Sequence, residues 1–149
     1  MAPAVPSLRA RALRALARRE HSREELRRKL EPLEAQPGEL DRLLDDLEKR
    51  GWLSEARFVE QLTRVRRRKY GASRILHELR EKGVSAASLG EARERLRKDE
   101  LAAARAVWHG KFGVLPRTLA EKARQARFLA SRGFSAEAIH AVLRTGDVE

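Results

Sequence analysis

The densest run of basic side chains is RVRRRK, residues 64–69. Guanidinium and ammonium groups bind phosphate and carboxylate oxygens through charge-assisted hydrogen bonds. Helical spacing predicts that several of these arginines share one side of a helix, opposite its apolar side chains Phe58, Leu62 and Val65. The predicted outward-facing basic stripe consists of Arg57, Arg64, Arg67 and Arg68.

Other basic residues extend this candidate surface. Arg66 and Lys69 fall towards the apolar side of the helix, so their charged ends must reach around it or lie near a neighbouring element. Tyr70 follows, and we favour packing under a corner over stacking on a base. The candidates for binding a filament or DNA are Arg57, Arg64, Arg67, Arg68, Lys69, Arg74, Arg23, Arg27 and Arg28. The last three form a second patch together with Lys29.

The charge balance supports a binding role for these residues. The chain has 33 Lys and Arg against 22 Asp and Glu, a formal net charge of +11. The basic excess lies in residues 1–30 and 61–98, on either side of an acidic excess in residues 31–60. Such a pattern favours a polyanion or an acidic protein surface as partner. The alternative is a well-solvated helical surface, because Arg and Lys are good helix formers.

No catalytic constellation emerges from the sequence. The four histidines lie on separate segments, without the spacing of metal ligands, and there is no Cys. His21 adjoins a helix-capping Ser, which favours a local role at a helix start. The acidic residues of 39–48 suit a solvated face, or intramolecular contact with the basic segments, better than a cation site. Trp52 and Trp108 are expected to pack in a corner and in the core. We therefore predict a protein that is not an enzyme and needs no cofactor or metal.

Every clear periodicity is helical, and no strand-like alternation is found. Ser22 with Glu25 predicts a capping box, and Pro116 is placed in a first helical turn. Residues 89–96 and 101–112 are expected to form two successive helices. The expected apolar stripe of the next helix comprises Leu119, Ala123, Ala126 and Ala130.

One helix-ending pattern occurs three times, in LEKRGWLS (47–54), LREKGVS (79–85) and LASRGFS (129–135). Each has Leu, a basic residue, Gly and an apolar residue, followed by Ser directly or one place later. A Gly just past a helix end adopts the left-handed conformation, and the apolar residue after it packs back on the Leu. The Ser then caps the next helix. Each copy therefore predicts a tight helix–helix corner.

These corners predict tandem three-helix repeats. A single three-helix unit of about 45 residues has a small core, and stacking of such units buries their remaining apolar faces. We expect an all-α fold of about three repeats stacked into an elongated, curved array. The predicted repeats are residues 1–50, with an N-terminal tail, residues 51–98, and residues 99–149, with a C-terminal tail.

The assembled motifs resemble the RecX family of regulatory proteins. The matching stretches are ALRALARREHSREELRRKL (12–30), GWLSEARFVEQLTRVRRRKYGASRILHELREKGVS (51–85) and KFGVLPRTLAEKARQARFLASRGFS (111–135). One departure is Ser54, where many members have Asp, and Ser is an equally good N-cap. The resemblance implies a modulator that binds the RecA–DNA filament and lowers its ATPase, strand-exchange and coprotease activities, with a tandem three-helix fold.

The resemblance also implies partners and context. The expected partners are RecA and its nucleoprotein filament in recombination, DNA repair and the SOS response, and some members also bind DNA. The alternatives are a general DNA-binding helical protein that acts without RecA, and a scaffold for another acidic partner. The N-terminus lacks the apolar core of a signal peptide, and no stretch approaches the roughly 20 apolar residues of a membrane span. We therefore expect a cytoplasmic protein. The sequence leaves the oligomeric state open, and a monomer is the simplest expectation.

Overall fold

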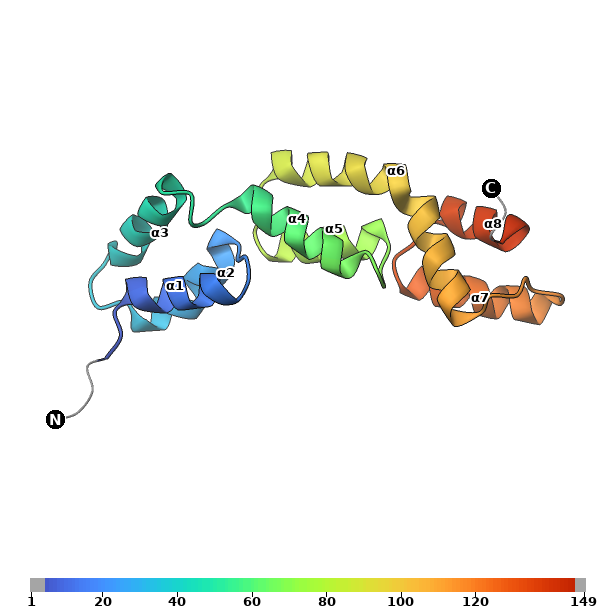
Figure 1. The fold of residues 1–149 in the computed structure, drawn as a ribbon, viewed down its shortest axis with the longest axis horizontal. Coiled ribbons are helices and arrows are strands. Elements are labelled where there is room, and N and C mark those ends of the chain that lie inside the picture. Colours follow the sequence, from blue (N-terminus) through green and yellow to red (C-terminus); the bar gives the residue numbers. More distant parts are fainter. Residues whose placement is uncertain (1–4, 147–149) are drawn as a thin grey trace. The chain divides into compact units, whose positions relative to one another are not determined.

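The computed structural model describes residues 5–146. Within them it contains eight α-helices, one short 3-10 helix and no strand, which confirms the all-α fold class (Figure 1). None of these helices is both long enough and apolar enough to cross a membrane. The elements are α1 (Leu8–Arg18), α2 (Arg23–Leu30), η1 (Glu31–Leu33), α3 (Glu39–Lys49), α4 (Glu55–Arg66), α5 (Ala72–Glu81), α6 (Ala86–Lys111), α7 (Leu119–Ser131) and α8 (Ala136–Thr145).

The described chain divides into two compact units. The first unit comprises residues 5–61 and 82–84, and the second comprises residues 62–81 and 85–146. The division falls within α4, so this helix contributes its first part to the first unit and its last turn to the second. The predicted boundaries of three repeats are a different division of the chain, and they stay a prediction.

The first unit is built around α1, α2 and α3. Its central leucines are at most 1% exposed, and burial of each such side chain contributes about 1.5–3 kcal/mol. Small residues on α1 allow the close approach of the other two helices, since Ala12 and Ala15 are also buried. The central leucines are Leu26, Leu30, Leu44 and Leu47.

A nearly buried carboxylate stabilises the start of α2. The predicted capping box is confirmed, with the Glu25 backbone N–H donating to Ser22 Oγ and the Ser22 N–H donating to Glu25 Oε1, both at 3.0 Å. The Glu25 side chain also pairs with Arg19 at 2.8 Å and Lys82 at 3.3 Å. Burial alone would raise the pKa of Glu25, but these hydrogen bonds and positive charges outweigh it and lower the pKa to about 2.

The second unit is organised by one long helix, α6, and the prediction of two helices in this region is wrong. Its buried residues recur every four positions, and each step turns about 40° around the helix axis. The buried stripe therefore winds along α6, which packs first on α5 and then on α7 and α8 (Figure 1). The stripe consists of Ala92, Leu96, Glu100, Ala104 and Trp108. The sequence suggested a break because Glu100 interrupts the apolar pattern.

The three predicted corners each contain a left-handed glycine, as expected. The hydrogen bond typical of the Schellman motif is present in two of them. The Trp52 N–H donates to the Leu47 carbonyl at 2.9 Å, and the Phe134 N–H donates to the Leu129 carbonyl at 3.2 Å. The predicted Ser caps also form, through Ser54, Ser85 and Ser135. The corner glycines are Gly51 (φ +77°), Gly83 (+80°) and Gly133 (+89°).

The register of α7 differs from the predicted one. Leu119 is 86% exposed, and Pro116 precedes the helix, whose N-cap is Thr118. The buried face carries Gln125 instead, because its Oε1 accepts the Trp108 indole N–H at 2.8 Å and its Nε2 donates to the Val114 carbonyl. An apolar pattern could not identify a buried Gln whose function is to satisfy a buried indole. Trp108, at 2% exposure, confirms the predicted core position.

Candidate polyanion-binding surface

Two corners of the second unit are joined by their backbones. The Gly71 N–H donates to the Arg132 carbonyl at 2.7 Å, and the Ser73 N–H donates to the Gly133 carbonyl at 3.3 Å. A Cβ on Gly71 would lie 2.4 Å from the Gly133 backbone, so only glycine permits this approach. The contact brings the start of α5 against the corner that follows α7.

The joined corners place two guanidinium groups around one aromatic ring. Arg74 lies 4.2 Å and Arg132 lies 5.6 Å from the centroid of the Tyr70 ring. Such cation–π contacts contribute about 0.5–1 kcal/mol each at exposed sites. Arg74 Nη1 also donates to the Ser131 carbonyl at 3.3 Å. Tyr70 therefore packs at the corner, as favoured, and orders Arg74, whereas Arg132 contacts both Tyr70 and the Phe128 ring, whose centroid is 4.9 Å away.

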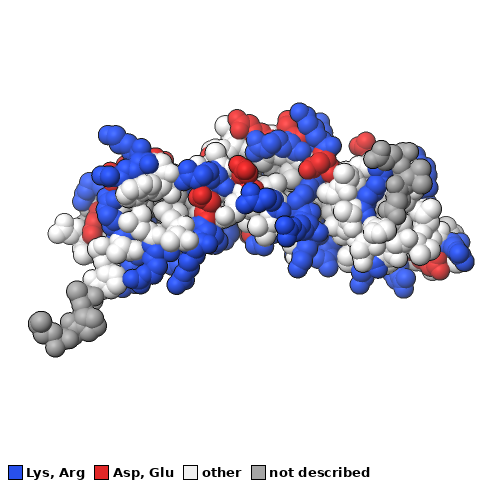
Figure 2. Space-filling model, in the orientation of Figure 1, with Lys and Arg blue, Asp and Glu red and all other residues white. Residues whose placement is uncertain are grey.

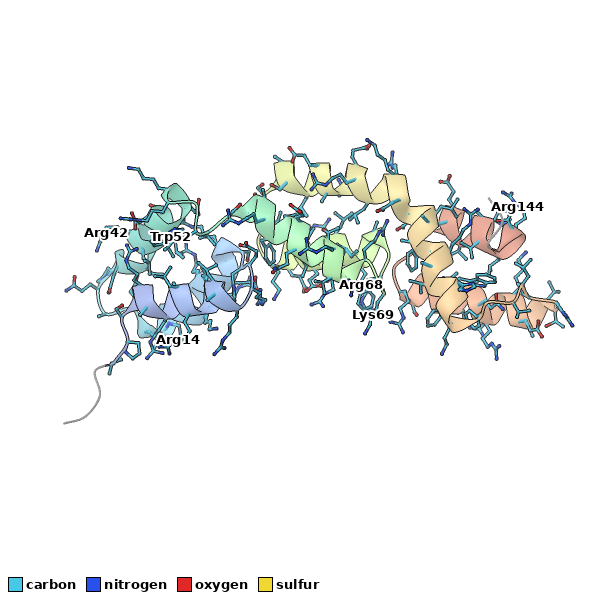
Figure 3. The ribbon with its side chains drawn as sticks, viewed as in Figure 1. Arg14, Arg42, Trp52, Arg68, Lys69 and Arg144 are labelled. Carbon is cyan, nitrogen blue, oxygen red and sulfur yellow. The ribbon has the colours of Figure 1, made fainter. Side chains whose placement is uncertain are left out.

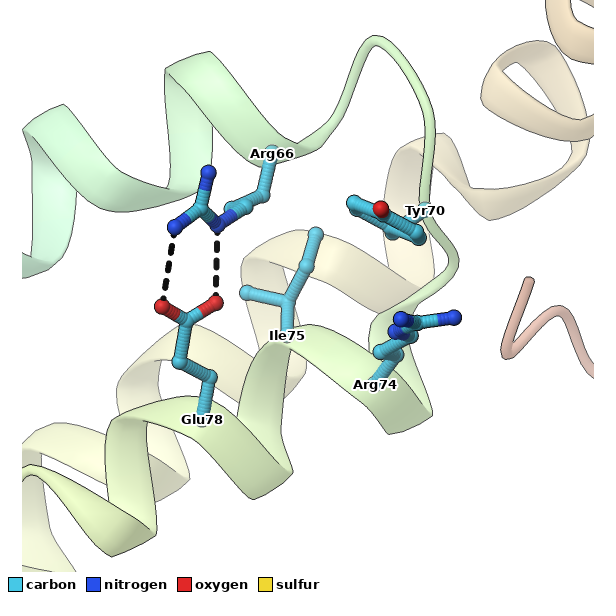
Figure 4. A pocket seen from close by; sticks show the side chains of 5 residues that line it. All are labelled: Arg66, Tyr70, Arg74, Ile75 and Glu78. Atoms are coloured by element: carbon cyan, nitrogen blue, oxygen red, sulfur yellow. Dashed lines mark hydrogen bonds and ion pairs between the residues drawn. The ribbon is translucent and has the colours of Figure 1, made fainter.

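Figure 4 shows Tyr70 and Arg74 side by side on the wall of an open pocket of about 270 Å³. Its opposite wall carries a bidentate ion pair, with Arg66 Nε 2.8 Å from Glu78 Oε1 and Arg66 Nη2 3.1 Å from Glu78 Oε2. The hydrogen bond to Glu78 raises the pKa of Arg66. Arg66 is thus held by a carboxylate and is not available to an external anion without breaking this pair.

Arg68 and Lys69 complete the cationic surface. Both are exposed, and Figure 3 shows their side chains projecting beyond the ribbon at this corner. Blue atoms gather at the same place in Figure 2. We define the corner cluster as Arg68, Lys69, Arg74 and Arg132 around Tyr70. None of its four cations forms an ion pair with a carboxylate of residues 5–146. Their charge is therefore available to an anionic partner.

The prediction that Arg67 faces outwards is wrong. Its side chain is only 11% exposed, whereas the apolar Val65 is 53% exposed. Arg67 Nη1 lies 2.7 Å from Glu100 Oε1, and Arg67 Nη2 lies 2.6 Å from Asp99 Oδ1 and donates to the Leu96 carbonyl. The helical wheel assumed that the helix continues through Arg67. Instead α4 ends at Arg66, with Phe58 and Val59 buried on it, and Arg67 lies in the following turn, where carboxylates on α6 match its charge.

Glu100 is the centre of this polar contact. It is 8% exposed, and besides Arg67 it accepts the backbone N–H of Ala72 at 3.0 Å and that of Ser135 at 3.2 Å. The first of these groups begins α5, and the second precedes α8. One carboxylate on α6 therefore connects the two corners that carry the corner cluster.

The second predicted basic patch is compensated by acidic residues of the first unit. Arg23 pairs with Asp45 at 2.8 Å and with Glu48 at 2.6 Å. Arg27 pairs with Asp41 at 2.8 Å. Of the two alternatives for the acidic segment, these ion pairs show intramolecular contact with the basic residues.

Two further candidates on this unit are also paired. Arg28 lies 3.2 Å from Glu24. Arg57 lies 2.9 Å from Glu20 and donates to the Gly51 carbonyl. Each pair is partly exposed, so a competing anion can displace it at modest cost. These arginines nevertheless lack the uncompensated charge of the corner cluster.

Sequence reasoning missed Arg132. It precedes a corner Gly, where a basic residue is explained by the negative end of the helix dipole. Only the approach of Gly71 to the Gly133 corner brings Arg132 to Tyr70, across about sixty positions of the chain. The one local signal is the glycine after Tyr70, and it does not identify its contact partner. Arg64 is exposed as predicted.

Comparison with known proteins identifies this architecture. Residues 54–92 match the family model "RecX, second three-helix domain", and residues 98–143 match "RecX, third three-helix domain". A solved structure described as RecX from Lactobacillus salivarius superposes with a TM-score of 0.74, at 17% identity, over 92% of each chain. That likeness shows the fold, and both matches agree with the predicted tandem three-helix domains.

Sequence relatives extend the match over almost the entire chain. A protein named regulatory protein RecX from Leptothrix cholodnii is 48% identical over 143 residues, which cover 96% of this chain and 91% of the relative. Another of that name from Ralstonia nicotianae is 44% identical over 141 residues, covering 95% and 89%. The family models and these identities together place the chain in the RecX family.

Proposed function

We propose that this chain binds RecA or the RecA–DNA filament and mainly inhibits its ATPase, strand-exchange and coprotease activities. Membership of a family of regulatory proteins supports a regulatory role. The observation that carries the proposal is the corner cluster, whose four cations have no acidic partner among the described residues. We assign filament contact to this cluster because both DNA phosphates and acidic protein grooves attract uncompensated positive charge.

The order of the cluster supports a binding role over mere solubility. Arg74 and Arg132 are positioned by the Tyr70 ring and by backbone hydrogen bonds between two corners. Ordering these side chains in advance reduces the conformational entropy lost on binding, about 0.5–1.5 kcal/mol per side chain. Cations that serve only solubility do not need such positioning.

The test is inhibition of the DNA-dependent ATPase of RecA. We expect the wild-type chain to lower the ATPase rate, and Arg68→Glu/Lys69→Glu to require at least about tenfold more protein for the same effect, about 1.4 kcal/mol of lost binding. The matched control is Arg95→Glu/Lys98→Glu, which makes the same charge change on exposed positions of α6. An ATPase unaffected by the wild-type chain would contradict the proposal. Equal loss of inhibition in the two variants would show that the corner cluster is not the site of filament contact.

The second candidate function is DNA binding without RecA, since uncompensated cations suit DNA phosphates equally well. Fluorescence anisotropy with labelled DNA and no RecA distinguishes the two functions. Each phosphate contact contributes about 0.9 to the slope of log affinity against log salt on duplex DNA. If Arg68→Glu/Lys69→Glu lowers that slope by about two while RecA inhibition is unchanged, the second function is favoured.

A further inference from the structure

Trp52 is a large apolar residue that the fold leaves half exposed. At the other two corners the apolar residue after the glycine is buried, Val84 at 6% and Phe134 at 5% exposure. Trp52 is 45% exposed, which contradicts the predicted packing, and the next residue, Leu53, is buried at 4% in its place. The first corner contains one residue more before its Ser than the others do. A large ring is thus left half exposed at the surface.

The ring is nevertheless held in a defined place. The N–H groups of both Trp52 and Leu53 donate to the Leu47 carbonyl, at 2.9 and 3.1 Å. The guanidinium of Arg50 lies 5.4 Å from the Trp52 ring centroid, and Arg50 Nε is itself anchored to Asp46 at 2.9 Å. Backbone and cation together fix the ring before any partner binds.

The surroundings of the ring indicate the chemistry of its partner. Residues 48–52 are all exposed, and Trp52 is the one apolar side chain among them. Apolar protein-binding sites are contiguous patches, whereas a single ring among cations is typical of a surface that stacks bases and contacts phosphates. Arg50 lies against the ring, and Lys49, the last residue of α3, is a second exposed cation of this segment. Figure 3 shows Trp52 beyond the end of α3.

We propose that Trp52 is a stacking site for an unpaired base of single-stranded nucleic acid, with Arg50 holding the ring and Lys49 as the cation that contacts the phosphates. One face of the indole takes the base. The site needs no RecA, so it does not rest on the proposed function.

Tryptophan fluorescence tests the proposal directly. The chain has two Trp residues, and Trp108 is buried with its indole N–H bonded to Gln125, so a bound base can quench only Trp52. We expect oligothymidine to quench wild-type emission, and a duplex of equal length to quench it much less. In Trp52→Phe the quenching disappears, but affinity measured by anisotropy stays within about threefold, since the ring is kept.

Removal of the ring is the second arm of the test. Trp52→Ala should weaken oligothymidine binding about 5- to 140-fold, the usual range for loss of one stacked base. The matched control is Leu33→Ala, because Leu33 lies in the same unit and is also 45% exposed. Circular dichroism should show unchanged helicity in both variants. Oligothymidine affinity equal in wild type and Trp52→Ala, or emission unaffected by oligothymidine, would overturn the proposal.

The outcomes separate this proposal from the function proposed above. If Trp52→Ala loses RecA inhibition and keeps its affinity for oligothymidine, Trp52 is a protein contact and the stacking proposal is wrong. If oligothymidine quenches Trp52 while the wild-type chain leaves the RecA ATPase unchanged, the stacking site stands and the regulatory proposal fails.

Discussion

Replacement of Glu100 by Ala should destabilise the second unit by about 4 kcal/mol. The substitution removes a carboxylate that accepts three hydrogen bonds, from Arg67 and from the backbone N–H groups of Ala72 and Ser135. Each orphaned donor costs about 1–3 kcal/mol, and breaking a buried ion pair costs about 3–5 kcal/mol. Because Arg67 keeps its contacts with Asp99 and with the Leu96 carbonyl, the value lies below the full sum.

Urea denaturation, monitored by the fluorescence of Trp108, measures the loss in free energy of unfolding of the unit that contains Glu100. The Trp52→Phe background leaves Trp108 as the one fluorescent Trp, so the signal reports on the second unit. The matched control is Glu94→Ala on the same helix, where the side chain is 65% exposed. An exposed substitution of this kind changes stability by about 0.5 kcal/mol or less.

A double-mutant cycle shows how much of the destabilisation by Glu100→Ala comes from the ion pair with Arg67 and how much from the backbone contacts. Arg67→Met removes the buried cation without leaving a charge, and the double variant Arg67→Met/Glu100→Ala should lose less than the sum of the two single losses. The reasoning is refuted if Glu100→Ala destabilises no more than Glu94→Ala does. Strict additivity would show that the pair itself is not coupled.

Four further predictions concern glycine and pH. Gly71→Ala should cost about 3 kcal/mol in urea denaturation, because its Cβ would meet the Gly133 backbone at 2.4 Å. Gly51→Ala should cost only about 1–2 kcal/mol, since its φ is +77° but no atom lies within 4 Å of a Cβ there, and a larger loss than in Gly71→Ala would contradict this. The pKa of Glu25 is about 2 against the usual 4.5, so its ionised form stabilises the fold fully above pH 4.5. This contribution to the free energy of unfolding should be lost as pH falls towards 2. In Glu25→Gln the free energy of unfolding should depend less on pH over this range. Burial lowers the pKa of His21 below its usual 6.5, so the free energy of unfolding should already decline as pH falls below 6.5, an effect absent in His21→Gln.

Features set by neighbouring residues could be predicted from the sequence. The left-handed glycines, the Ser caps and the Ser22–Glu25 capping box follow from contacts within a few positions, and all are present. The leucine stripe of α3 was also identified, because every apolar residue in it is buried. Such features need no knowledge of which helix packs on which.

The failures at Arg67, α6 and α7 share one physical cause, the burial of polar groups. Periodicity analysis treats a polar residue as exposed, so it placed Arg67 outside and Val65 inside, and it divided α6 at Glu100. Gln125 misled the register of α7 in the same way. Each of these groups is buried because a partner distant in sequence satisfies it. The pairing depends on tertiary structure and leaves no local pattern.

The same buried polar contacts explain why the candidate surface could be found only in part. Arg68, Lys69 and Arg74 were identified from charge density alone, since exposure is the default for a basic residue. Arg132 joins them through the backbone contact at Gly71, and that contact is supported by Glu100 between the two corners. The internal ion pair of Arg67 and the arrangement of the corner cluster therefore both depend on Glu100. The carboxylate that takes Arg67 out of the surface also holds the start of α5 and the corner before α8, the two places where Arg74 and Arg132 meet around Tyr70.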